Sequence, residues 1–108
     1  MIPEEHYENG MNHFSEDRLD DAIAEFHKAL EKDSSYADAV HALAMCHFHK
    51  GDYDQAIQWG HRYREIEPDS PLAYTSLSMF YQAKGMIPEA EEMGAKAQEA
   101  SRRLPADA

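Results

Sequence analysis

The stretch that decides the fold runs from residue 37 to residue 57 and reads ADAVHALAMCHFHKGDYDQAI. Apolar residues recur in it at spacings of three and four, first around Leu43 and again around Ala56, with a Lys-Gly-Asp break at residues 50–52. This spacing is typical of two amphipathic helices that are joined by a short turn. The stretch therefore predicts a helix-turn-helix unit.

The pattern recurs at a period of 34 residues. Ala22, Ala56 and Ala90 are 34 residues apart, and Gly51 and Gly85 precede the second and third alanines by five. A fixed period of this length indicates a stack of repeats, each built from one supersecondary unit. Three units, residues 3–36, 37–70 and 71–104, cover 102 of the 108 residues, and we expect a single domain over residues 1–108.

Breaks in the periodicity set the expected helix boundaries. The Lys-Gly-Asp break separates two helices within a unit, and an Asp-Ser-Pro sequence at residues 69–71 marks the turn between two units. Proline suits the first turn of the helix that follows it. No strand pattern competes with this interpretation. Helices are expected at residues 3–15, 19–32, 37–50, 53–67, 71–84 and 87–103.

The repeated unit resembles the tetratricopeptide repeat family. That family's pattern runs from a large residue through Leu and a small residue to Gly-Asp-Tyr, then Ala and Pro. Gly60 and Gly94 depart from it, since an aromatic residue is usual there. The resemblance implies an all-α fold, a right-handed superhelical α-solenoid of three helix-turn-helix repeats, in which the first helix of each pair lines a concave groove. The second unit matches the pattern at Val40, Leu43, Ala44, Gly51, Tyr53, Ala56 and Pro68.

Polar residues stand at both ends of the expected stack. His6 and Asn9 occupy positions that are apolar in the other units, and Glu91 replaces the isoleucine of the first two units. A stack of repeats needs a polar outer face at each end. We therefore expect the three repeats to form a complete domain.

The charge of the chain restricts its partners. It carries 21 acidic and 10 basic residues, a formal net charge of −11, and residues 1–38 alone contribute −8. Such a balance repels phosphate backbones and anionic lipid surfaces. We expect no nucleic acid and no membrane partner, and a basic or amphipathic protein fits better.

Catalytic, metal and cofactor sites are not expected. Cys46 is the only cysteine, and His41 and His49 are about 12 Å apart along a helix, too far for one ion to span. The chain has no Gly-rich phosphate loop, and its serines lack an evident His and Asp support. The interpretation is therefore a protein that is not an enzyme.

The single cysteine also indicates a reducing compartment. The sequence has no signal-peptide pattern and no apolar run long enough to span a membrane. We expect a cytoplasmic protein.

The resemblance assigns the function to the concave groove. Met11, Met45 and Met79 take equivalent places in the three units and would form an apolar strip there, with acidic residues at one end. Methionine adapts to varied apolar partners. The expected groove residues are Tyr7, Glu8, Met11, Phe14, Asp38, His41, Met45, Phe48, His49, Thr75, Met79 and Gln82.

The expected function is that of a scaffold that binds another protein or peptide. An apolar or amphipathic peptide or helix with flanking Lys or Arg would fit the groove. Members of the family that clamp an acidic carboxylate tail resemble one another in groove Lys, Asn and Arg residues. The matching positions here, which hold no cation, are Tyr7, Met11, Ala42, Leu72 and Ser76.

Two alternatives remain open at this point. The three methionines would have no binding role if they packed between neighbouring first helices. The chain would instead be a structural self-assembly module, at least a weak homo-oligomer, if its last helix or its groove met a second copy.

Overall fold

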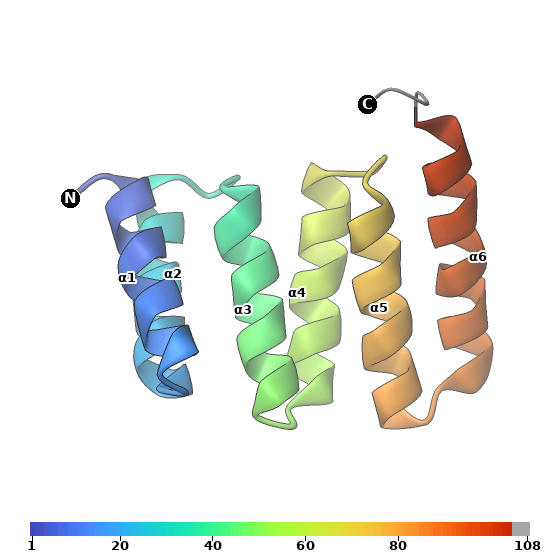
Figure 1. The fold of residues 1–108 in the computed structure, drawn as a ribbon, viewed down its shortest axis with the longest axis horizontal. Coiled ribbons are helices and arrows are strands. Elements are labelled where there is room, and N and C mark those ends of the chain that lie inside the picture. The colour runs from blue at the N-terminus through green and yellow to red at the C-terminus, as the bar shows by residue number, and fades with distance from the viewer. Residues whose placement is uncertain (105–108) are drawn as a thin grey trace.

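The computed structural model describes residues 1–104, and these form six α-helices without a strand (Figure 1). The predicted boundaries hold, except that the third and fourth helices each end one residue earlier than expected. None of these helices is long and apolar enough to cross a bilayer. The helices are α1 Pro3–Ser15, α2 Leu19–Lys32, α3 Ala37–His49, α4 Tyr53–Ile66, α5 Pro71–Lys84 and α6 Ile87–Arg103.

Each helix packs against the next one along the chain, and the helix pairs follow one another in a row, with α2 behind α1 in the view of Figure 1. The closest pairs are α1 with α2, α3 with α4 and α5 with α6, while α2 also packs on α3 and α4 on α5. Figure 1 shows the row running from the N-terminal to the C-terminal end of the molecule, whose extents are 38 × 34 × 21 Å. The arrangement is the expected α-solenoid of helix-turn-helix repeats.

The turn within each pair has the same backbone geometry. The last residue of each turn donates its N–H to a carbonyl five residues earlier at 2.9 Å, as in Arg18 to His13. The residue before it has a positive φ: 80° at Gly51, 86° at Gly85 and 61° at Asp17. Glycine adopts this left-handed conformation without steric cost, whereas Asp17 does not. The αL position recurs at the period of 34 even where the glycine is missing.

Close helix packing depends on small residues opposite large ones. A Cβ atom on Gly10 would lie 2.4 Å from Cε1 of Phe26, which is fully buried. A Cβ on Gly60 would lie 2.8 Å from Leu77 and 3.3 Å from Phe80. Phe80 therefore occupies the room that an aromatic side chain at position 60 would need. The departure at Gly60 is thus a change of packing within the same fold.

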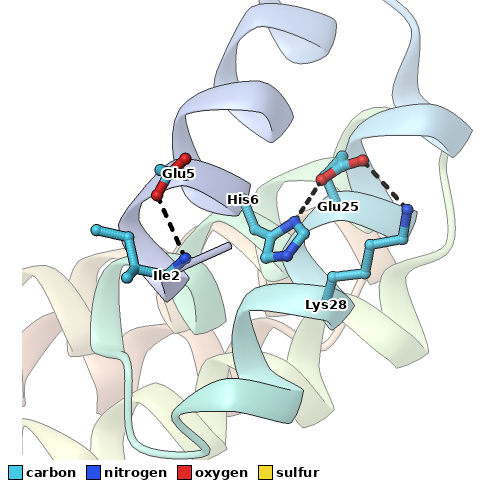
Figure 2. Close-up of polar contacts among 5 residues, drawn as sticks. All are labelled: Ile2, Glu5, His6, Glu25 and Lys28. Atoms are coloured by element: carbon cyan, nitrogen blue, oxygen red, sulfur yellow. Dashed lines mark hydrogen bonds and ion pairs between the residues drawn. The ribbon is translucent and has the colours of Figure 1, made fainter.

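The N-terminal end of the row carries a polar contact where the other repeats are apolar (Figure 2). His6 Nδ1 lies 2.9 Å from a Glu25 carboxylate oxygen, and Lys28 donates to the other oxygen at 3.3 Å. The hydrogen bond to His6 is the main cause of a lowered Glu25 pKa. One repeat later, the equivalent positions hold Val40 and Trp59, which pack in the core.

The first test of this packing compares two mid-helix glycines. Gly10→Ala pushes a methyl group into the Phe26 ring and is expected to destabilise the fold by about 1–3 kcal/mol. A Cβ on Gly94 meets only Ser78 Oγ at 3.6 Å. Gly94→Ala should therefore stabilise by about 0.5–1 kcal/mol through the loss of backbone freedom in the unfolded chain. Urea unfolding measures both, and equal effects of the two changes would contradict the packing described.

A second test concerns the first turn. Asp17→Gly should raise the free energy of unfolding by about 1 kcal/mol, because glycine removes the strain of the left-handed conformation. Gly51→Asp, the reverse change at the equivalent position, should lower it by a similar amount. Thermal or urea unfolding measures the change in the free energy of unfolding of both variants. A loss of stability in Asp17→Gly would show that the Asp17 side chain has a structural role.

Candidate functional site

An apolar hollow lies between α1 and α3. Both helices pack on α2 and make few contacts with each other, so a space of about 290 Å³ stays open between them. Its side chains recur at helical spacings of three and four, which places them on one face of each helix. They are Tyr7, Met11, Phe14, Asp38, His41, Ala42, Met45 and His49.

The hollow brings together seven of the expected groove residues, all from the first two repeats, and none from the third. Glu8 is exposed on α1 outside the lining of the hollow, and Thr75, Met79 and Gln82 are exposed on α5. The Phe48 ring packs instead against Phe80, with ring centroids 5.3 Å apart. The strip expected along three helices is therefore a hollow on two of them, with a separate exposed surface on α5.

Met11, Met45 and Met79 are not fully buried in the core. Met11 is 39 % exposed and Met79 37 % exposed, and Met45 is half-buried with part of its surface on the neighbouring core cluster. Met11 lines the hollow from α1, and Met45 lines it from α3. They supply an apolar surface that is open to solvent.

His41 forms one wall of the hollow and ties α3 to α5. Its Nε2 lies 3.0 Å from the hydroxyl oxygen of Ser76, and its ring packs 5.1 Å from the ring of Tyr63. Burial lowers the pKa of His41, with the nearby Asp38 opposing the shift more weakly. The imidazole is therefore neutral at physiological pH.

One end of the hollow is acidic and aromatic. The rings of Tyr7 and Tyr36 stack with centroids 5.5 Å apart. Burial raises the pKa of both phenols, and the Asp38 carboxylate adds to both shifts; Glu4 adds further to that of Tyr36. The carboxylates of this end therefore lie close to the two rings.

Tyr36 was not among the residues expected from the sequence. It lies in the turn before α3, outside the helical periodicity, and only the tertiary contact with Tyr7 brings it to the site. A tyrosine at the boundary of one repeat alone is a weak signal, because the equivalent residue of the next repeat is Ser70.

The other end of the hollow is aromatic. The His49 ring meets Phe14 edge-on with centroids 5.5 Å apart, and it makes a similar contact with Phe48. The hollow therefore runs from a carboxylate at one end, past two methionines, to a ring cluster at the other.

Reactive and metal-binding groups do not gather here. Cys46 is fully buried, and burial raises the pKa of its thiol to about 11, so the thiolate needed for nucleophilic chemistry is scarce. Within residues 1–104, no three His, Cys, Asp or Glu side chains are grouped so that they could hold a metal ion. The arrangement suits the burial of an apolar or amphipathic side chain.

Comparison with known proteins agrees with the fold. A family model described as tetratricopeptide repeat matches residues 13–78. No curated protein matches the sequence significantly. Among solved structures, a crystal structure of MamA has a TM-score of 0.91 and 29% identity, over 94% of this chain and 60% of MamA. This chain therefore spans about three fifths of the MamA chain.

Two further structures share the fold at lower identity. The first TPR of Spaghetti (RPAP3), bound to the HSP90 peptide SRMEEVD, has a TM-score of 0.87 and 17% identity, over 94% of this chain and 81% of that one. The Yersinia enterocolitica type III secretion translocator chaperone SycD has a TM-score of 0.89 and 23% identity, over 95% and 77%. At these identities the likeness concerns the fold alone.

The buried state of His41 predicts a pH dependence of stability. Its pKa in the folded chain is below the usual 6.5, so the unfolded chain binds more protons, and stability is lost as the pH falls through the folded pKa. His41→Gln keeps a group that can bond to Ser76 but does not titrate. Urea unfolding at about pH 7.5 and about pH 5.5 should show a smaller loss in the variant. An equal loss in both proteins would mean that His41 does not contribute.

Proposed function

The chain belongs to the tetratricopeptide repeat family, and on that basis we propose that it is a non-catalytic scaffold that binds another protein or peptide. One observation carries the proposal: an open hollow between α1 and α3 whose walls are largely apolar. We further propose that residues 1–108 form one domain of three 34-residue repeats, 3–36, 37–70 and 71–104. The free Cys46 supports a cytoplasmic location.

The proposed ligand is an apolar or amphipathic peptide or helix, with basic residues flanking its apolar part. Met11, Phe14 and Met45 offer adaptable contact surface, and Asp38 favours positive charge at one end. Glu8, Phe48, Thr75, Met79 and Gln82 lie outside the hollow, and any contribution of theirs to binding would be secondary to that of the lining residues.

The similar structures are compatible with this proposal. The RPAP3 domain holds an HSP90 peptide, SRMEEVD, and SycD is a translocator chaperone. The HSP90 peptide ends in three acidic residues out of four. Because the hollow of this chain has a carboxylate and a neutral imidazole rather than a cation, we propose a ligand of different charge.

Self-association is the second candidate function. Leu72 and Met79 leave large apolar side chains exposed on α5, and Ile87 does so at the start of α6. Light scattering after size exclusion, over a wide range of concentrations, separates the two functions. A monomer at every concentration favours a separate partner, whereas a dimer that Leu72→Gln dissociates favours self-assembly.

The binding function is tested with peptides selected from a random library on the wild-type chain. The paired change Met11→Gln and Met45→Gln removes apolar contact without adding charge, and it should weaken binding by about tenfold or more. Fluorescence anisotropy of a labelled peptide measures the affinity.

Met79→Gln is the matched control. It is the same substitution at the equivalent position of the third repeat, where the side chain is about as exposed but lies outside the hollow. We expect a much smaller effect. A loss of binding in Met79→Gln, without a loss in the paired variant, would move the binding site to α5.

A further inference from the structure

We propose that the hollow between α1 and α3 takes a basic side chain of the partner, a Lys or an Arg. Its aliphatic stem would lie along Met11 and Met45, and its cation would meet the carboxylate of Asp38. The inference rests on the proposed function and adds to it the chemistry of the residue that enters the hollow.

The first argument is the unpaired charge of Asp38. Within residues 1–104, no Lys, Arg or His side chain lies within ion-pair distance of its carboxylate. Asp20 pairs with Lys50 and, one repeat later, Asp54 pairs with Lys84, whereas Asp38 has no such partner in the described part of the chain. Asp38 is thus a carboxylate on the lining of an apolar hollow that the chain itself leaves without a counter-charge.

This charge decides which side chain the hollow favours. Asp38 is exposed at one end of the hollow, so a purely apolar side chain would fill the middle but leave the carboxylate without a partner. An acidic side chain would be repelled. A basic side chain buries its methylene groups against apolar walls while its charged end pairs with the carboxylate. Lys and Arg alone satisfy both parts of the hollow.

The dimensions agree with such a side chain. Asp38 and Met45 are seven residues apart on α3, about 10 Å along the helix axis. A four-carbon lysine stem or the slightly longer arginine side chain spans much of this length. The space of about 290 Å³ holds one large side chain, with the ring cluster of Phe14 and His49 closing the far end.

The surroundings of Asp38 also favour a cation. Tyr7 lines the hollow beside it, in a position that is held by ring contacts with Tyr36 and with Phe26 at 5.8 Å. An aromatic face near a carboxylate adds a cation–π attraction for an ammonium or guanidinium group. His41 does not compete for Asp38 as a cation, because it bonds to Ser76 and burial keeps its pKa low.

The wider charge distribution would guide a basic partner to this end. The carboxylates of Glu4 and Glu8 act on Tyr36 together with that of Asp38, and within residues 1–104 neither glutamate is in an ion pair. Such a field raises the rate of encounter with a cation and suppresses acidic partners. A polybasic protein segment is the source to which the proposal commits.

The test uses peptides selected from a random library on the wild-type chain, with a Lys or Arg in the selected consensus as the first expected result. Replacing that residue by norleucine keeps an aliphatic stem and removes the charge. We expect affinity to fall by about tenfold or more on this change. Asp38→Asn should weaken the basic peptide by a similar factor and leave the norleucine peptide unaffected, so that the two changes are not additive.

Asp21→Asn is the matched control. Asp21 is also exposed in the first turn of a helix, α2, and Asp21→Asn removes the same charge without touching the hollow. Circular dichroism and the melting temperature show whether each variant is folded. An equal loss of affinity in Asp21→Asn and Asp38→Asn would show that binding depends on the net charge of the chain and not on the position of Asp38. That result would overturn the proposal.

The outcomes separate this inference from the proposed function. If the Met11→Gln and Met45→Gln changes weaken binding but the norleucine peptide binds as well as the basic one, the hollow binds an apolar residue, and only this inference fails. A consensus without Lys or Arg has the same meaning. If the methionine changes have no effect on any selected peptide, the proposed binding site fails as well.

Discussion

The structure depends on one packing constraint: wherever a large side chain enters between two helices, the facing position must be small. Phe26 lies over Gly10, and Phe80 takes the space beside Gly60. Protein interiors are packed too densely to hold two large residues in such a place. Each helix is thereby held against the next one along the chain. Both α1 and α3 pack mainly on α2 and hardly on each other. The hollow between α1 and α3 results from this packing, because the two helices leave a space where they do not contact each other.

The side chains that line the hollow differ in polarity from one end to the other. Met11 and Met45 line its middle, a ring cluster closes one end, and Asp38 lies at the other end beside Tyr7. Burial lowers the pKa of His41 and keeps it neutral, while its bond to Ser76 ties the second repeat to the third. Under the proposal, this surface would distinguish partners by charge as well as by apolar contact, because Asp38 repels an acidic occupant and pairs with a basic one.

Much of the fold could be predicted from the sequence because the period of 34 residues fixes the helices and their turns together. Six helices were expected within one residue of where they lie. The turn at Asp17 keeps the geometry of Gly51 and Gly85, since the repeat around it imposes that geometry. The resemblance to tetratricopeptide repeats also predicted most lining residues of the hollow. Side-chain contacts between repeats were beyond such reasoning: the stacking of Tyr36 on Tyr7 and the packing of Phe48 on Phe80 depend on neighbours that the period does not specify.

The central claim is that a partner binds between α1 and α3. Methionine methyl groups labelled with ¹³C report on it directly, because Met11 and Met45 line the hollow while Met79 lies outside it on α5. The measurement is an NMR titration of the wild-type chain with a library-selected peptide. The account predicts saturable shifts of the Met11 and Met45 methyl signals and little change at Met79. Shifts confined to Met79, with Met11 and Met45 unchanged at saturation, would contradict it.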